Sequence, residues 1–197
     1  MRLRPVLVGI LLAVSRASAH AADREIQIQP FIAVSLGART TFALLDTAVQ
    51  KPNVVFGARA LVLGEIVGIE VDVGHAPGFF QSANNLVLHS RVTTLSGNIV
   101  VAMPRRLTEY TLRPFFVGGG GVMVARAEDF LGILPVSDTL PAIDVGGGVS
   151  GFITNTVGVV WDLRYFRSVA GNDQSGESNF GQHLSFWRAG MALALRY

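Results

Sequence analysis

The residues of this chain best suited to covalent chemistry are His183 and Ser185. A serine nucleophile needs a histidine within hydrogen-bond reach to take its proton, and an acid that orients the histidine. The His-x-Ser pair supplies two of these groups, but no Asp or Glu follows Glu177. Glu177 itself lies upstream, in a polar stretch. The sequence therefore does not favour a hydrolase, and His183 is interpreted as a loop residue before the last strand.

A glycine pattern, Gly146-x-Gly148-x-x-Gly151, matches a dinucleotide-binding fingerprint by letter. That motif works only when a helix follows it, because the helix N-terminus holds the pyrophosphate. Residues 152–157 read Phe-Ile-Thr-Asn-Thr-Val, which are β-branched and turn-forming. We expect these glycines to thin the wall of a β-barrel or fill its interior, and we expect no nucleotide cofactor.

The potential metal ligands show no pattern. The four histidines, at positions 20, 75, 89 and 183, are scattered along the chain. The absence of cysteine excludes disulfides, thiolate metal sites, iron–sulfur clusters and a cysteine-anchored lipoprotein. We therefore expect no metal, no cofactor and no enzymatic activity.

The apolar residues alternate with small or polar ones over long stretches, most clearly at 67–73, 157–165 and 187–197. A period of two indicates strands with one apolar face. Beyond residue 22 no window predicts a transmembrane helix. The longest charge-free apolar stretch, 115–125, contains four consecutive glycines and is too short to span a bilayer.

The alternation predicts eight strands joined by connections of two lengths. The expected strands are 26–38, 53–63, 66–75, 88–103, 111–126, 142–153, 157–168 and 186–197. Short turns are expected at Gly64-Glu65, Pro104 to Thr108 and Thr154-Asn155, and longer polar loops at 39–52, 76–87, 127–141 and 169–185. Short turns on one rim and long loops on the other are typical of a transmembrane barrel. We expect an all-β, eight-stranded antiparallel up-and-down transmembrane β-barrel with short periplasmic turns and longer extracellular loops.

The residues on the less apolar face of the strands indicate whether lipid or water surrounds the barrel. In a secreted soluble barrel, which is the alternative, exposed positions would carry Lys, Glu and Thr. Here the second face holds Gly, Ala, Ser and a few ions, which suits a tightly filled interior. Eight strands leave a lumen just wide enough for side chains. The apolar face would then contact lipid, with Trp161, Tyr165, Trp187 and Tyr197 near the interfaces.

Charged residues at the alternate strand positions that are expected to face inward form a candidate network in the lumen. Its members are Arg59, Glu70, Asp72, Arg113, Asp144, Asp162, Arg164 and Arg188, joined by Arg196. In a lumen without bulk water these charges should pair, because an unpaired buried charge is costly. Asp162 and Arg164, two residues apart, both point inward and are expected to find partners on neighbouring strands. The network is expected to plug the lumen; the alternative is a gated ion pathway.

The first residues predict export. A basic start with Arg2 and Arg4, an apolar run at 6–14 and the small-x-small site Ala17-Ser18-Ala19 are typical of a signal peptide. We expect a signal peptide at 1–19 and one barrel domain at 20–197. Without the three arginines of the signal, 13 of the 16 basic residues face 14 acidic ones. No basic patch remains for nucleic acid.

Several motifs resemble one family. They are Leu112-Arg113-Pro114-Phe115-Phe116 leading into Gly118 to Gly121, then Asp144-Val145-Gly146-Gly147-Gly148, Thr154-Asn155 and Asp162-Leu163-Arg164-Tyr165, with an aromatic end at Tyr197. Over roughly residues 26–197 the chain resembles the β-barrel domain of outer-membrane proteins of the A, X and W types. The resemblance implies insertion among outer-membrane lipids. No peptidoglycan-binding module is expected after the barrel.

The resemblance also bears on assembly. Met191, Leu193, Leu195 and Tyr197 occupy one face of the last expected strand. In the resembled family such an ending is the address read by the barrel assembly machinery. We therefore expect this machinery to be a partner during biogenesis.

Two roles follow from these expectations. In the first, a plugged barrel stabilises the envelope and displays loops, with an extracellular ligand reached through 76–87, 127–141 and 169–185. The 127–141 stretch is unusually apolar and would extend its hairpin, cover the barrel mouth or form a contact patch. In the second, which the W-type resemblance allows, the barrel is a narrow channel for small or apolar solutes. A lipid-modifying enzyme is a distant third.

Overall fold

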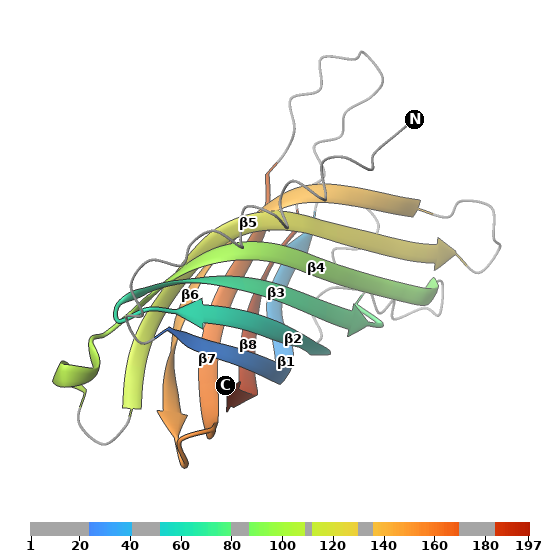
Figure 1. Cartoon of the computed structure of the whole chain (residues 1–197). Coiled ribbons are helices and arrows are strands. Elements are labelled where there is room, and N and C mark those ends of the chain that lie inside the picture. The colour runs from blue at the N-terminus through green and yellow to red at the C-terminus, as the bar shows by residue number, and fades with distance from the viewer. Residues whose placement is uncertain (1–23, 41–51, 80–86, 109–111, 130–135, 170–183) are drawn as a thin grey trace, which may run out of the picture.

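The computed structural model describes residues 24–40, 52–79, 87–108, 112–129, 136–169 and 184–197 (Figure 1). The expected signal peptide at 1–19 and His183 lie outside these residues. In the described part of the chain, no helix is both long and apolar enough to cross a membrane.

Eight strands and one short 3-10 helix make up the described structure. They are β1 (Glu25–Thr40), β2 (Asn53–Leu63), β3 (Val67–Pro77), β4 (Val87–Ala102), η1 (Arg105–Leu107), β5 (Leu112–Asp129), β6 (Val136–Phe152), β7 (Val157–Ser168) and β8 (Leu184–Arg196). Each strand pairs antiparallel with the next, and β8 pairs with β1 to close the barrel. The last of these contacts runs from the Tyr197 amide to the Ile26 carbonyl oxygen, at 3.0 Å. The predicted eight-stranded antiparallel barrel is confirmed.

The two rims of the barrel differ. One rim, called here the short-turn rim, carries the start of β1, the end of β8, and the connections 64–66, 103–111 and 153–156. Strands β5 and β6 have 18 and 17 residues, against 11 in β2 and β3. A tilted strand needs about 9–11 residues to cross a bilayer. The β5–β6 hairpin is therefore long enough to project beyond the membrane at the opposite rim.

The long loops are shorter than the sequence predicts. Strand β3 continues to Pro77, β5 continues to Asp129, and β6 begins at Val136 rather than at residue 142. Strand β8 begins at Leu184, so residues 184 and 185 belong to it. Pro141, which the sequence places in a loop, lies inside β6 opposite Val122, where its ring faces outward. Most of the apolar stretch 127–141 thus extends its hairpin, and residues 130–135 lie outside the described part.

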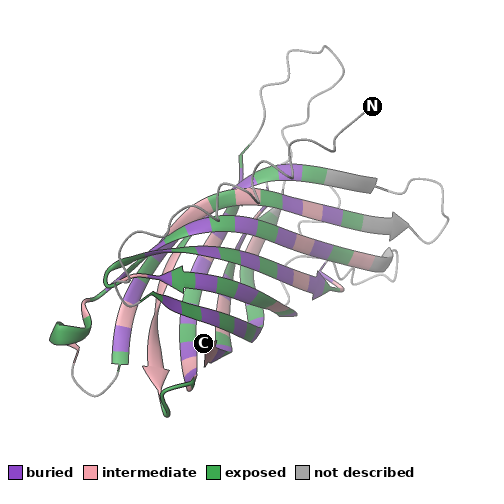
Figure 2. Ribbon diagram, in the orientation of Figure 1, coloured by how far each residue is buried: buried purple, intermediate pink, exposed green. Residues whose placement is uncertain are grey.

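Burial alternates along most of the strands (Figure 2), and the glycine-rich end of β6, residues 146–152, is the exception, with every residue half-buried. Outward positions carry large apolar side chains, such as Ile69 at 66% and Phe116 at 74% exposed. Inward positions carry most of the buried polar and charged side chains. A water-soluble barrel would place charge outside and apolar groups inside, so this exterior fits a hydrocarbon environment.

Inward glycines make room for the larger lumen side chains. A Cβ atom on Gly119 would lie 2.2 Å from Oδ1 of Asn98, and one on Gly146 would lie 2.9 Å from Cγ of Arg164. The glycine fingerprint that contains Gly146 lies within β6 and is followed by a turn and β7, not by a helix. Its glycines serve packing in the barrel wall, as the sequence indicated.

Candidate functional site

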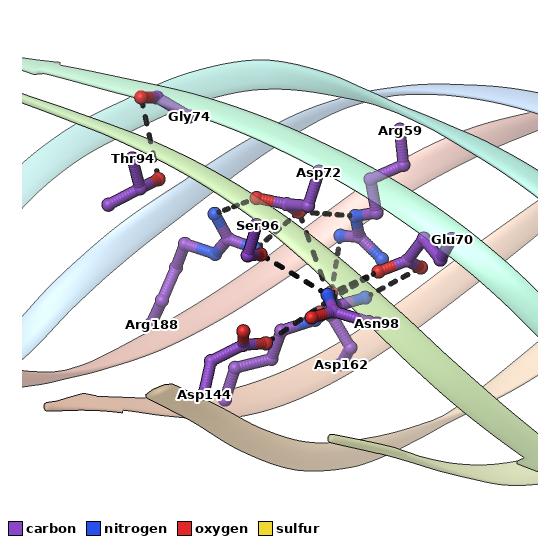
Figure 3. A network of polar contacts seen from close by, with 11 residues as sticks. Arg59, Glu70, Asp72, Gly74, Thr94, Ser96, Asn98, Asp144, Asp162 and Arg188 are labelled. Carbon is purple, nitrogen blue, oxygen red and sulfur yellow. Dashed lines mark hydrogen bonds and ion pairs between the residues drawn. The ribbon is translucent and has the colours of Figure 1, made fainter. Parts of the chain in front are cut away.

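The barrel interior contains a cluster of buried charged side chains, and it is the candidate functional site among the described residues. The eight charged residues assigned to the lumen by the sequence are all inside the barrel and at most 7% exposed; they are Arg59, Glu70, Asp72, Arg113, Asp144, Asp162, Arg164 and Arg188. Seven of them form one central network, called here the lumen network (Figure 3). Arg113 lies apart, at the short-turn rim.

Arg164 is the centre of the lumen network. Its Nη1 and Nη2 atoms donate to the two carboxylate oxygens of Glu70 at 2.6 and 3.0 Å. Its Nε atom donates to Oδ2 of Asp162 at 2.6 Å. This fork geometry is the strongest pairing available to a guanidinium. The Arg164 side chain has no solvent-exposed surface.

Arg59 and Arg188 extend the network on either side. Arg59 donates through Nη2 to Asp162 at 2.8 Å, and its Nε lies 3.3 Å from Oδ2 of Asp72. Arg188 donates through Nη1 and Nη2 to both oxygens of Asp72, at 2.9 and 2.6 Å. Asp72 therefore lies between the two arginines, as Figure 3 shows.

The ion pairs differ from the expected pattern in one respect. Asp162 and Arg164 were expected to pair with neighbouring strands, but Asp162 pairs with Arg59 on β2 and Arg164 pairs with Glu70 on β3. Both partners lie across the lumen from β7, since the order of strands in the barrel is sequential. Asp162 and Arg164 also pair with each other. In a barrel this narrow, long arginine side chains reach the opposite wall.

Asp144 is the exception in the network. Neither of its carboxylate oxygens accepts a hydrogen bond from an arginine, and its polar neighbour is the Ser96 side chain, although the residue is only 4% exposed. Its nearest cationic atom is Nη1 of Arg164, at 3.9 Å. Within the lumen network three arginines face four carboxylates. With every group ionised, the network would carry one surplus negative charge.

An aromatic layer covers the network on the side away from the short-turn rim. The Arg188 guanidinium lies 4.6 Å from the ring centroids of Phe31 and Phe166, which places it within cation–π range of both. Phe166 stacks on Phe186 at 5.2 Å, and Phe79 contacts Phe186 edge-on at 5.3 Å. The lumen is thus filled by ion pairs and then by aromatic rings.

A second charged cluster, called here the mouth cluster, lies at the short-turn rim. It joins Arg105, Arg113 and Arg196 to one acid, Glu25. These residues line a partly open cavity of about 390 Å³. A much smaller cavity of about 20 Å³, lined by Gln27, Glu70 and others, lies between the mouth and the lumen network.

Two residues of the mouth cluster, Glu25 and Arg105, are not among the residues predicted to face the lumen. Glu25 lies one residue before the first predicted strand, which begins at residue 26, and Arg105 lies in a predicted turn. The alternation of β1 could have found Glu25, since residues 27, 29 and 31 are inward and 25 continues the series. Arg196, which was predicted to face inward, belongs to this cluster and is partly exposed.

The remaining candidate residues form no catalytic or metal site in the described structure. No group of three or more His, Asp and Glu in the described ranges is placed to hold a metal ion. Ser185 is on the outward side of β8, partly exposed, in register with Arg167 and Arg39. His75 also faces outward and hydrogen-bonds Oγ1 of Thr93 at 2.9 Å.

Three of the four residues assigned to assembly lie on the outer face of β8, and the fourth, Tyr197, directly follows the strand. Met191, Leu193 and Tyr197 are exposed, and Leu195 is partly exposed. Leu195 pairs with Val157 of β7 on one side and with Ile28 of β1 on the other. The end of β8 therefore completes the closing seam.

Comparisons with known proteins identify the fold. No protein-family model matches the sequence, and no curated protein matches it in sequence. Solved structures with the same fold include Neisserial surface protein A, at 16% identity and a TM-score of 0.54 over 86% of this chain and 95% of that one. The N-terminal β-barrel domain of Pseudomonas aeruginosa OprF has 13% identity and a TM-score of 0.52, with 88% and 97% of the two chains covered. A major outer-membrane protein of Thermus thermophilus has 14% identity and a TM-score of 0.50, with 90% and 100% covered. The chain has the fold of the small eight-stranded outer-membrane barrels.

Proposed function

We propose that this protein is an integral outer-membrane β-barrel with a structural and surface-interaction role and a closed lumen. The apolar exterior and the fold shared with outer-membrane proteins support the location. The short-turn rim would face the periplasm, as in the transmembrane barrel pattern. The long β5–β6 hairpin would then rise above the outer surface.

The observation that carries the proposal is the filling of the lumen. Arg59, Arg164 and Arg188 cross the interior and are at most 2% exposed. Their carboxylate partners hold them there, and the aromatic layer lies beyond. A hydrated path would require these side chains to be exposed to water, which they are not.

Planar-bilayer recording tests this proposal directly. The refolded protein should insert without a sizeable single-channel conductance, while an open porin in the same bilayer serves as the positive control. A stable, sizeable conductance from correctly folded protein would reject the closed-lumen role. Folding would be checked beforehand by the difference in gel mobility between boiled and unboiled samples.

Outer-membrane lipids are the first proposed partners. Arg91 and Arg126 are both exposed on the outer face and lie directly opposite each other on β4 and β5. Neither has an ion-pair partner among the described residues. Like charges placed together destabilise a strand pair, whereas anionic lipid headgroups near the surface would stabilise them.

An extracellular ligand is the second proposed partner. The proposed contact regions remain the segments between strands at the rim opposite the short turns, within 76–87, 127–141 and 169–185. The extension of β5 and β6 supports a contact through the middle segment, because paired strands hold its base in place. Binding to whole cells that do or do not express the protein, with β5–β6 loop deletions, would test this contact.

The barrel assembly machinery is the proposed partner during biogenesis. The outward residues Met191, Leu193, Leu195 and Tyr197 support this proposal, because they form a continuous apolar face on the closing strand. No nucleic-acid partner is proposed.

A narrow channel is the alternative function. The observation in its favour is that the mouth cavity and the small inner cavity share Gln27 and Ser150 in their linings, so a partial path leads inward from the short-turn rim. The path ends at Glu70 and the lumen network. A channel would therefore need a rearrangement of the arginines, and the bilayer recording distinguishes the two functions.

We propose no enzymatic activity. Ser185 faces outward on β8, and its sequence partner His183 lies outside the described residues. Unchanged lipid composition after overexpression is the expected result, and a new lipid species that depends on Ser185 would contradict it.

A further inference from the structure

The mouth cluster has more positive charge than its own acid can neutralise. Three guanidinium groups surround the single carboxylate of Glu25. The neighbouring Arg106 pairs with Glu65 at 3.1 Å and adds no net charge. The cluster therefore carries two surplus positive charges beside a cavity of about 390 Å³.

Glu25 has no capacity left to absorb this surplus. Its Oε1 atom accepts hydrogen bonds from Nε2 of Gln27 and from Arg196, and its Oε2 atom pairs with Arg105 and lies 3.6 Å from Nη1 of Arg113. The arginines, in contrast, have five N–H donors each. Arg105 uses one nitrogen on Glu25, and its side chain is 53% exposed. Donors thus remain directed toward the cavity and its opening.

Two of the three arginines, Arg113 and Arg196, are also held in place. Arg113 donates through Nε to the Met103 carbonyl oxygen at 2.9 Å and through Nη2 to the Glu65 carbonyl oxygen. The Arg196 guanidinium lies 3.6 Å from the ring centroid of Phe152. A site whose donors are fixed before binding loses little side-chain entropy when a ligand arrives.

We propose that the mouth cluster binds a phosphate group, with Arg105 and Arg196 as its main ligands and Arg113 as a fixed positive charge behind them. A phosphate monoester carries about −1.5 to −2 charges at neutral pH, which matches the surplus of two, whereas a single carboxylate would leave part of it unbalanced. The group would come from a soluble phosphorylated molecule or from a lipid at the same rim whose headgroup is a phosphate monoester, since both present the same doubly charged group to the arginines.

Titration of the full chain with inorganic phosphate tests the site. The protein would be refolded in zwitterionic micelles at constant ionic strength, and the arginine Nε–H signals followed by NMR. We expect saturable shifts in the millimolar range. Arg105→Gln should weaken binding about tenfold, by removing a charged donor, and Arg105→Lys should weaken it less.

Two further variants separate binding from a structural effect. Arg106→Gln is the matched control, because Arg106 is adjacent, 84% exposed and absent from the cavity lining, and it should bind as the unmodified protein does. Glu25→Gln should bind phosphate more tightly, because it removes the internal acid that competes for the same donors. Loss of packing alone would not strengthen binding.

Titrations with acetate and with lipid vesicles identify the chemical class of the ligand and its source. Acetate should bind more weakly than phosphate, and equal binding of acetate would overturn the assignment. Vesicles containing phosphatidic acid, whose headgroup is a phosphate monoester, would assign the site to a headgroup if they shift the same signals in an Arg105-dependent way where inorganic phosphate does not. No saturable response to either probe, or an equal loss in Arg105→Gln and Arg106→Gln, would overturn the proposal.

Discussion

The same substitution at two buried aspartates of the lumen network should change the stability of the barrel by very different amounts. Asp162→Asn and Asp144→Asn each replace a carboxylate by an amide of nearly equal size. Asp162 accepts charge-assisted hydrogen bonds from Arg59 at 2.8 Å and from Arg164 at 2.6 Å. Asp144 accepts none from an arginine, and its nearest guanidinium nitrogen, on Arg164, is 3.9 Å away.

The expected magnitudes follow from these contacts. Asp162→Asn leaves Arg59 and Arg164 short of one counter-charge in a dry interior, and removal of one partner of a buried pair costs about 3–5 kcal/mol. Asp144→Asn removes the surplus negative charge of the network without breaking a hydrogen bond to an arginine, and the amide oxygen can still accept from Ser96. We expect it to change the free energy of unfolding by less than about 1 kcal/mol, or to raise it.

Urea unfolding in lipid vesicles measures both changes. The two tryptophans of the chain, Trp161 and Trp187, lie on the outer face at 53% and 43% exposure, so their fluorescence reports transfer from lipid to water. The midpoint of Asp162→Asn should fall clearly and that of Asp144→Asn should not, with the slope unchanged. Equal losses in the two variants, or an unchanged midpoint for Asp162→Asn, would show that the lumen is hydrated or the pairing is wrong.

Four further outcomes are expected. The purified protein should give a β-type circular dichroism spectrum in detergent and should migrate differently on gels when boiled; a helical spectrum would contradict the fold. Val71→Lys places a charge on the lipid face and should cost about 2–4 kcal/mol near the bilayer centre, whereas Leu107→Lys, on η1 at the rim, should be nearly neutral in the same urea assay. Gly146→Val should destabilise the barrel more than Gly97→Val, because a Cβ atom at 146 meets Arg164 and one at 97 meets nothing within 4 Å; equal midpoints would contradict this. Deletion of residues 195–197 should leave exported protein in the periplasm, and normal outer-membrane levels on fractionation would reject the role of the closing strand.

The alternation of apolar and polar residues along each strand was sufficient to predict which charged side chains face the barrel interior. In a strand the side of each residue depends only on parity, so Arg59 and Asp72 could be assigned to the interior without knowledge of the closed barrel. Their partners could not be predicted in the same way. Which carboxylate Arg164 reaches depends on closure between β8 and β1 and on space left by Gly146, and neither is a local property of the sequence.

The strand ends were the least predictable part of the fold. Pro141 favours a loop when only the sequence is considered, because proline has no N–H to donate to a strand ladder. In β6 the residues on either side continue the inward–outward pattern, with Leu140 and Ala142 buried. At Pro141 the strand is in register with β5 alone, because the pairing with β7 begins at Ala142, and pairing with β5 continues past the one missing donor. The same kind of error, by a single residue at the start of β1, concealed Glu25.

The lumen network also explains why the strands adopt one register. In lipid, apolar side chains gain little by moving inward, so the hydrophobic effect alone does not decide which face of a strand points to the lumen. Charged residues do decide it, because a slip of one residue turns every side chain to the opposite face. Such a slip in β7 would place Asp162 and Arg164 in hydrocarbon and Trp161 in the lumen. The cost of charge in the bilayer excludes that arrangement. The buried ion pairs of the lumen network therefore also specify the inward face of each strand that carries them.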